Sequence, residues 1–232
     1  MDIDQDISFC GESTNISSFI NGNFKMKIAG GSFYIPKSNK VPLGEDAHFI
    51  CIEEEIIGVA DVVDGWAKKG IDSGEYSRQL VRNAELSIHK QKDQKNKIQP
   101  LEVLNEAYFN TKCQGSSTTC ILTLMCNNVH AVNLGDSGFV GIRHGVIVYK
   151  LEIQQKGFDY PFQLGNGVKF DDSSVVQEIK VTVRTCDVIV MSTDGLFDNV
   201  HNIELEKLVR DGLMDLRELE IFWRNCSYGL EE

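Results

Sequence analysis

Hydrophobic and polar positions alternate along much of the chain, and the breaks in this alternation mark the expected elements. FKMKIAGGSFYI, residues 24–35, alternates as strands interrupted by Gly30 and Gly31. HFICIEEEIIGVAD, residues 48–61, is apolar on both sides of an acidic turn, which predicts a β-hairpin that ends in a carboxylate. Residues 1–23 are rich in Asp, Asn, Ser and Gly without periodicity, so we expect a loose lead-in there.

Helical spacing replaces this alternation in the next part of the chain. From Ser73 to about Lys90 the pattern predicts a helix with Ser73 as N-cap and an apolar face of Tyr76, Leu80, Ala84 and Ile88. The charged residues 89–97 then indicate a solvated connection. Pro100 begins a second predicted helix, which ends before Gly115 and has an apolar stripe of Leu101, Leu104, Ala107 and Tyr108.

Short β-type runs dominate the chain beyond Gly115. They are separated by Asn, Gly and Asp turn signals and comprise residues 119–125, 129–135, 138–145, 146–151, 175–184 and 187–193. Two helical pieces follow, one starting near Ile203 and one near Met214. This order predicts an α+β fold with antiparallel sheets and helices packed outside them.

Composition narrows the class of protein. With 232 residues and 42% hydrophobic content, the chain is long enough for one substantial core, so we expect a single domain. A net charge of -11 disfavours nucleic-acid and anionic-membrane surfaces as partners. No apolar run approaches the roughly 20 residues of a membrane-spanning helix, which predicts a soluble protein without membrane insertion.

Cysteine usage bears on the compartment. The chain has 7 cysteines, with no CxxC pair and no His at zinc-finger spacing, which favours reduced thiols inside the cell. The start of the chain lacks the Arg-rich composition of a transit peptide. The sequence therefore does not separate mitochondrion, chloroplast and cytoplasm.

The candidate chemistry lies in carboxylates where β-type runs start or stop. Glu45 and Asp46 precede one run, while Asp61, Asp136 and Asp194 follow others. Strand ends gathered at one edge of a sandwich would bring these side chains together, and clustered carboxylates require a cation. Oxygen ligands favour magnesium or manganese over zinc. Ordinary turn chemistry is the alternative for each position taken singly.

Five ordered motifs resemble those of type 2C (PPM) metal-dependent protein serine/threonine phosphatases. They are GEDAHF at 44–49, GVADVVDGW at 58–66, GSSTT at 115–119, NLGDSG at 133–138 and STDGLFDN at 192–199. YSRQL at 76–80 and PFQLG at 161–165 look most like the branch of plant and mitochondrial phosphatases of the yeast Ptc-seven kind. The resemblance extends from about Phe24 to about Lys207 and implies a PPM-type phosphatase domain over residues 24–232.

This resemblance implies a four-layer αββα sandwich with two Mg²⁺ or Mn²⁺ ions at one end. It also implies hydrolysis of phosphoserine and phosphothreonine in phosphorylated proteins through an activated water. By resemblance, Asp61 and Asp194 are the catalytic candidates. The implied metal ligands are Glu45, Asp46 through water, the bridging Asp61, the Val62 carbonyl, and Asp194, with Asp136 and Asp194 at a third, weaker ion.

The sequence also departs from the family pattern. The family has Asp-Gly-X-Gly-Gly where Val62, Val63 and Asp64 follow Asp61, and a β-branched residue does not easily adopt a glycine's positive φ, which predicts weakened metal affinity. The phosphate-binding Arg is absent, leaving Lys37 and Lys40 as weak candidates. We also expect the family's final strand to be missing and the protein to be a monomer. A catalytically impaired, phosphoprotein-binding relative is the alternative function.

Overall fold

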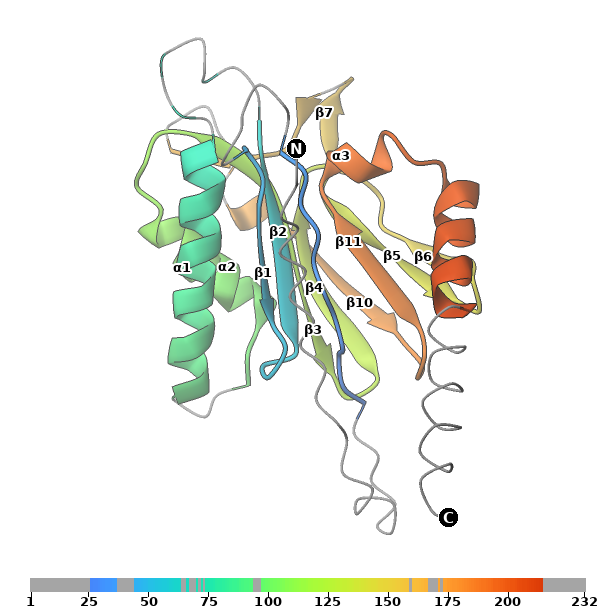
Figure 1. Cartoon of the computed structure of the whole chain (residues 1–232). Helices are drawn as coiled ribbons and strands as arrows, with labels where there is room; N and C mark the ends of the chain where they lie inside the picture. The colour runs from blue at the N-terminus through green and yellow to red at the C-terminus, as the bar shows by residue number, and fades with distance from the viewer. Residues whose placement is uncertain are drawn as a thin grey trace, which may run out of the picture.

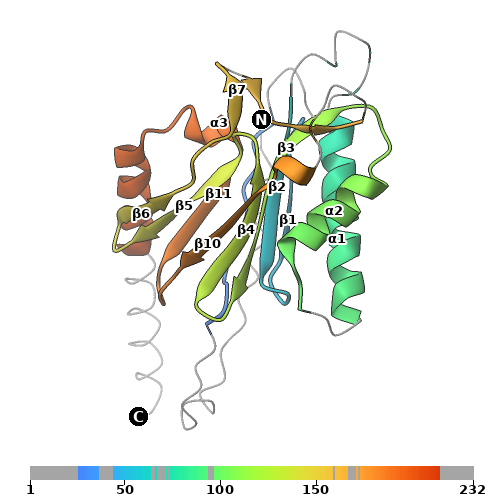
Figure 2. The same cartoon turned by 180° about the vertical axis from the view of Figure 1, so that it is seen from behind.

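The computed structural model describes residues 26–36, 44–63, 66, 70, 72, 74–93, 97–158, 160–166, 171 and 173–214. Two antiparallel sheets face each other, with helices on the outer face of each (Figures 1 and 2). The expected α+β sandwich of antiparallel sheets between helices is therefore confirmed.

The larger sheet has the strand order β1-β2-β3-β4-β10, with β9 paired to β3. Every ladder in it is antiparallel. Its strands are β1 (Ala47–Cys51), β2 (Ile56–Val62), β3 (Ser116–Met125), β4 (Asn128–Leu134), β9 (Leu164–Gly165) and β10 (Gln177–Thr182). The hairpin predicted around the acidic turn is β1–β2.

The smaller sheet has the order β11-β5-β6 and consists of β5 (Gly138–Arg143), β6 (Val146–Lys150) and β11 (Val188–Ser192). A separate hairpin of β7 (Gln155–Gly157) and β8 (Tyr160–Pro161) lies at one end of the sandwich (Figure 1). A 3₁₀ turn covers Ser173–Val175, and the short helix α3 (Asp194–Phe197) follows β11.

Three apolar clusters fill the three interfaces between these layers. Helices α1 (Gly74–Asp93) and α2 (Pro100–Asn110) pack on the larger sheet, and the predicted face of α1, Tyr76, Leu80, Ala84 and Ile88, is buried there. Between the sheets lie Leu122, Ala131 and Phe139, among others. The helix over residues 202–214 covers the smaller sheet through Leu205, against Val140 and Ile142.

Strand β5 shows why some runs are apolar without interruption. Phe139 faces the interface between the sheets, and its neighbour Val140 faces the outer helix. Both side chains are about 1% exposed. A strand buried on both faces has no polar side, so its sequence does not alternate.

One prediction about the elements was wrong. Residues 26–36 belong to no strand, although alternation predicted strands at 24–35. Met26 and Ile28 pack on the cluster between the sheets, but Gly30 and Gly31 offer no side chains to pack, and Phe33 and Ile35 are exposed, so the alternation does not continue along a buried face. The helix predicted from near Ile203 is found over residues 202–214, and the second helix predicted from near Met214 lies outside the described residues. The predicted cap Ser73 lies outside the described residues.

Within the ranges that the structure describes, no helix has both the length and the apolar character needed to span a bilayer.

Tyr76 provides a test of the core between α1 and the larger sheet. Its side chain is fully buried, and its hydroxyl has no hydrogen-bond partner among the described residues. Burial raises the pKa of this phenol. Because Tyr76→Phe removes an unsatisfied polar group and leaves the ring, we expect the free energy of unfolding to stay the same or to rise by up to about 1 kcal/mol.

The matched control is Tyr108→Phe, measured by urea denaturation in parallel. The Tyr108 hydroxyl donates to the Gly165 carbonyl oxygen at 3.4 Å, so its loss should lower the free energy of unfolding by about 1 kcal/mol. A loss at Tyr76 as large as that at Tyr108 would show that the Tyr76 hydroxyl does contribute to stability.

Candidate metal centre

Strand periodicity directs Asp61 toward the space between the sheets. Ile57 and Val59 on β2 contact the cluster between the sheets, whereas Ile56 and Ala60 contact the cluster under the helices. Successive side chains of a strand point to opposite faces, so Asp61 shares the face of Ile57 and Val59. It lies near the end of β2, where the strand leaves the sandwich.

The register of β1 on β2 brings a second carboxylate to the same place. Ala47 is opposite Ala60, and continuing this antiparallel ladder by one residue sets Asp46 opposite Asp61. Directly opposite residues share a face of the sheet, so the two carboxylates approach each other.

Asp194 comes from the other sheet, because α3 begins directly after β11. Thr193, the residue before it, donates its hydroxyl to Asp46 Oδ2 at 3.4 Å. This contact joins the end of the smaller sheet to the start of β1 in the larger sheet. Three residues far apart in the sequence, Asp46, Asp61 and Asp194, are thereby neighbours in space.

The electrostatics show how crowded this site is. Burial raises the pKa of Asp61 far above its usual range, and the carboxylates of Asp46 and Asp194 raise it further. In the described part of the chain, the charged groups acting on Asp61 are thus all acidic. A cation that entered this space would relieve the repulsion.

Asp136 adds a fourth carboxylate beside Asp194. It follows β4 through Gly135, whose φ is +99° and whose position leaves no room for a Cβ, which would lie 2.6 Å from Thr118 Cγ2. Burial raises the pKa of Asp136 to about 6, with contributions from Asp194 and Asp198, while a hydrogen bond from Gln155 lowers it. Asp194 therefore adjoins both Asp61 and Asp136.

The donor set fits a hard divalent cation. Carboxylate oxygens are the preferred ligands of Mg²⁺ and Mn²⁺. The neighbouring carboxylates together attract a divalent cation more strongly than a single carboxylate would. As the side chains stand, no group of three or more Asp, Glu, His or Cys residues in the described part of the chain is placed to hold a metal ion. The carboxylate contacts around Asp61 supply the core of such a site, and the remaining coordination would come from main-chain oxygens and water.

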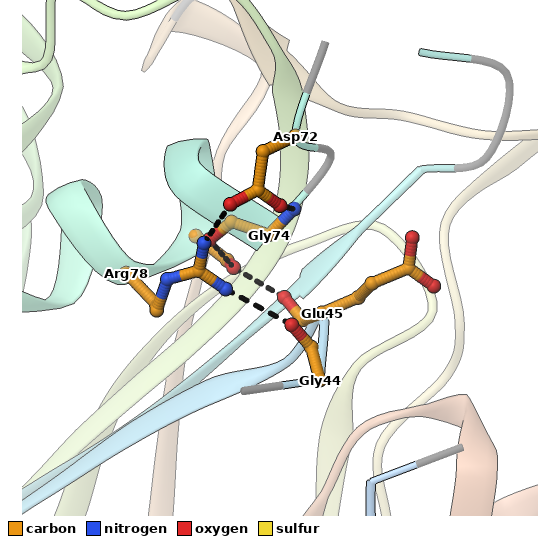
Figure 3. A network of polar contacts seen from close by, with 6 residues as sticks. Gly44, Glu45, Asp72, Gly74 and Arg78 are labelled. Atoms are coloured by element: carbon orange, nitrogen blue, oxygen red, sulfur yellow. Dashed lines mark hydrogen bonds and ion pairs between the residues drawn. The ribbon is translucent and has the colours of Figure 1, made fainter. Parts of the chain in front are cut away.

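Glu45 and Val62 lie at the border of this site. Glu45 is buried, and its side chain extends away from the start of α1 (Figure 3). Val63 N–H donates to the Ser116 carbonyl oxygen at 3.2 Å, and hydrogen-bonding direction alternates along a strand. The Val62 carbonyl therefore points away from β3, toward the side of β1 and Asp46.

The expected backbone strain at Val62 is not found. Val62 is a paired residue of β2, opposite Ser117, and it is not among the described non-glycine residues with positive φ. A β-branched residue is well suited to this extended conformation. The strain expected at Val62 is therefore absent, while the predicted loss of metal affinity itself stays a prediction.

Several predicted residues lie outside the described residues. They are the phosphate-binding candidates Lys37 and Lys40, and Asp64 in the altered loop.

The polar residues in the other motifs contact the protein itself. Asn133 donates to the Gly135 carbonyl oxygen at 3.2 Å, and Asn199 donates to the Gly195 carbonyl oxygen at 2.9 Å. The hydroxyls of Thr118 and Ser137 are 2.7 Å apart. These contacts agree with the interpretation that such residues brace the loops that carry Asp136 and Asp194.

Three residues at the site were missed by sequence reasoning. Gln155 contacts Asp136, Thr193 contacts Asp46, and Tyr34 lies close enough for Asp46 to raise its phenol pKa, after the larger effect of burial. Gln155 has no local sequence signal, and Thr193, although it lies in the STDGLFDN motif, becomes a partner of Asp46 only through the folding of distant segments. Tyr34 occurs in a segment that was expected to form a strand.

Comparison with known proteins finds phosphatases. The chain is 47% identical over 185 residues to the probable protein phosphatase 2C 55 of Arabidopsis thaliana, covering 79% of this chain and 39% of that protein. It is 44% identical over 185 residues to the probable protein phosphatase 2C 80 of the same plant, covering 79% of this chain and 44% of that protein. The chain thus spans less than half of these two curated relatives. No protein-family model matches it.

Solved structures show the same fold. The X-ray structure of the photosystem II phosphatase PBCP aligns with a TM-score of 0.71 at 29% identity, covering 75% of this chain and 69% of that one. The catalytic domain of the serine/threonine phosphatase PstP, in complex with two manganese ions, aligns with a TM-score of 0.50 at 14% identity, covering 74% and 84%.

The close approach of Asp46 and Asp194 to Asp61 predicts how the free energy of unfolding responds to a substitution at Asp61. In buffer with a chelator, Asp61→Asn should raise the free energy of unfolding by at least about 1 kcal/mol, because it removes a carboxyl group whose ionised form is opposed by burial and by two neighbouring carboxylates. In saturating Mn²⁺ the unsubstituted protein should gain about 2.7 kcal/mol at a hundredfold excess over Kd, and the variant far less. Denaturation curves with and without Mn²⁺ measure both effects.

Asp93→Asn is the control, because Asp93 is an exposed carboxylate at the end of α1. It should leave both the metal-free stability and the Mn²⁺ gain unchanged. An Asp61→Asn protein that gains as much from Mn²⁺ as the unsubstituted chain would contradict a metal site at Asp61.

Proposed function

Because the chain belongs to the type 2C (PPM) family of protein phosphatases, in the branch with the PTC7-like enzymes, we propose that it hydrolyses phosphoserine and phosphothreonine in protein substrates with Mg²⁺ or Mn²⁺. The observation that carries the proposal is the meeting of Asp46, Asp61 and Asp194 at one end of the sandwich. These oxygen ligands suit the divalent cations that phosphoryl-transfer chemistry uses. The manganese complex of PstP, which has the same fold, is compatible with this choice.

The proposed metal ligands form two groups, and Asp194 belongs to both. We propose that Asp61, Asp46 and Glu45 would hold one divalent ion and that Asp61 and Asp194 would hold a second. The Val62 carbonyl, directed toward β1, completes this group. Asp136, together with Asp194, would hold a third ion that binds more weakly.

When bound, divalent cations supply Lewis-acid activation of water and screening of the phosphoryl charge. The chain's own contribution is to hold the carboxylates in place before substrate arrives. Thr193 orients Asp46 through its hydroxyl, and Gln155 donates to Asp136. Lys37 and Lys40 remain the proposed contacts to the substrate phosphate.

Other proposals concern the setting of the protein. Its substrates would be phosphorylated proteins, with the chain acting as a monomer. All five cysteines in the described residues are unpaired, which supports an intracellular location. No observation on the described residues favours a non-catalytic, phosphoprotein-binding module over the enzyme.

The test is phosphate release from a phosphoserine peptide. The purified chain should be active with Mn²⁺ and inactive with a chelator. Asp61→Asn and Asp194→Asn should each reduce kcat/KM by at least about a hundredfold, since each removes a negatively charged ligand. Asp136→Asn should reduce it less, because Asp136 borders the weaker ion.

Asp93→Asn is again the matched control and should retain full activity. Absence of metal-dependent phosphate release from a folded chain that binds Mn²⁺ would overturn the proposed enzyme and favour a binding module.

A further inference from the structure

The turn that carries Glu45 and Asp46 is held through its main chain by the start of helix α1. Arg78 Nη1 donates to the Gly44 carbonyl oxygen at 2.9 Å, and the Ser77 hydroxyl donates to the Glu45 carbonyl oxygen (Figure 3). Both acceptors belong to the two residues directly before Asp46. These contacts therefore fix the path of the chain as it enters β1.

Arg78 is itself oriented by Asp72. Its Nη2 pairs with Asp72 Oδ2, while Asp72 Oδ1 accepts from the Gly74 backbone N–H at 3.1 Å (Figure 3). A guanidinium presents its nitrogens in a rigid planar fork, so one nitrogen can hold Asp72 while the other reaches Gly44. We name Asp72, Ser77 and Arg78 the α1 clamp.

The clamp has little room for adjustment. Ser77 is fully buried, and its hydroxyl also lies 3.0 Å from the Gly74 carbonyl oxygen. A Cβ added at Gly74 would lie 2.6 Å from the Gly44 carbonyl oxygen and 2.2 Å from Arg78 Nη1. The first turn of α1 thus contacts the turn before β1 too closely for any residue but glycine at position 74.

Tyr34 closes the other side of the same turn. Gly44 has a φ of +60°, and a Cβ there would lie 1.5 Å from the Tyr34 hydroxyl oxygen. The backbone N–H groups of Asp46 and Glu45 interact with this phenol. The turn is therefore enclosed between Tyr34 and the α1 clamp.

This enclosure opposes a specific force. When both are ionised, Asp46 and Asp61 repel each other unless a cation lies between them, and Asp46 is carried by a turn and not by a ladder. Arg78 neutralises neither carboxylate by direct contact, since its recorded partners are Asp72 and the Gly44 carbonyl. Its effect on the site passes through the main chain of residues 44–46.

We propose that Asp72, Ser77 and Arg78 are positioning residues for the metal centre, which hold the Asp46 carboxylate beside Asp61 so that affinity for a divalent cation depends on Arg78. This inference rests on the proposed function, in which Asp46 and Asp61 border a metal ion. It assigns a role to the YSRQL motif that the carboxylates alone do not explain.

The test is Mn²⁺ binding to the metal-free chain by calorimetry, with Arg78→Lys as the main variant. Lysine keeps the positive charge but has a single nitrogen, which cannot hold Asp72 and Gly44 in the same fork geometry. We expect the Kd for Mn²⁺ to rise roughly tenfold, as is typical when a residue that orients metal ligands is changed. Ser77→Ala should raise the Kd in the same direction.

Two controls separate positioning from general stability. Arg82→Lys changes an exposed arginine one turn further along α1 and should leave the Kd within about twofold. Tyr108→Phe lowers stability by removing a hydrogen bond to Gly165 that is not part of the α1 clamp, and it should also leave the Kd unchanged. Phosphatase activity of Arg78→Lys should recover at high Mn²⁺, because the chemistry of the loaded site is intact.

The outcomes are distinct. A Kd for Arg78→Lys within about twofold of the unsubstituted chain, together with lower stability, would overturn the positioning role and leave Arg78 a structural residue. Failure of the unsubstituted, folded chain to bind Mn²⁺ would instead overturn the proposed function on which the inference rests.

Discussion

Repulsion among the carboxylates of Asp46, Asp61 and Asp194 acts at one end of the sandwich, where burial removes much of the water that would screen it. In water such charges would move apart. Here each is attached to a strand end or a braced turn, so separating them would require breaking ladders or packing. The free energy gained from strand pairing and packing therefore keeps the carboxylates close together before a cation binds.

Strand register sets the direction in which the Asp61 side chain points. Asp61 faces the space between the sheets because β2 is paired to both β1 and β3 in a register set by buried side chains on its two faces. A slip by one residue would direct Asp61 toward the helices. The packing between the layers therefore also sets the position of the Asp61 carboxylate. The turns at 44–46 and 135–137 lie outside the strand ladders, so hydrogen bonds and close contacts around each turn fix their conformation.

The success of sequence reasoning about the elements followed from burial. Helix α1 was predicted because its face of Tyr76, Leu80, Ala84 and Ile88 packs on the larger sheet, and packing imposes the helical period on the sequence. Alternation at residues 26–36 was misleading because only Met26 and Ile28 pack on the cluster between the sheets, whereas Phe33 and Ile35 are exposed and no ladder partner among the described residues holds the segment. Periodicity predicts structure only where one face is buried.

The sequence by itself determined most strands of the two sheets, helices α1 and α2, and the candidate carboxylates, because hydrophobic period is a local property of the chain, while the four layers were implied by the family resemblance. It also indicated a divalent cation, because oxygen ligands were the shared chemistry of the strand ends. Only the tertiary structure decided that Val62 is extended and unstrained, that Thr193 and Gln155 contact the carboxylates, and that Arg78 holds the turn before Asp46. These facts depend on contacts between residues up to 147 positions apart, whose distances are set by packing and register and not by any local pattern.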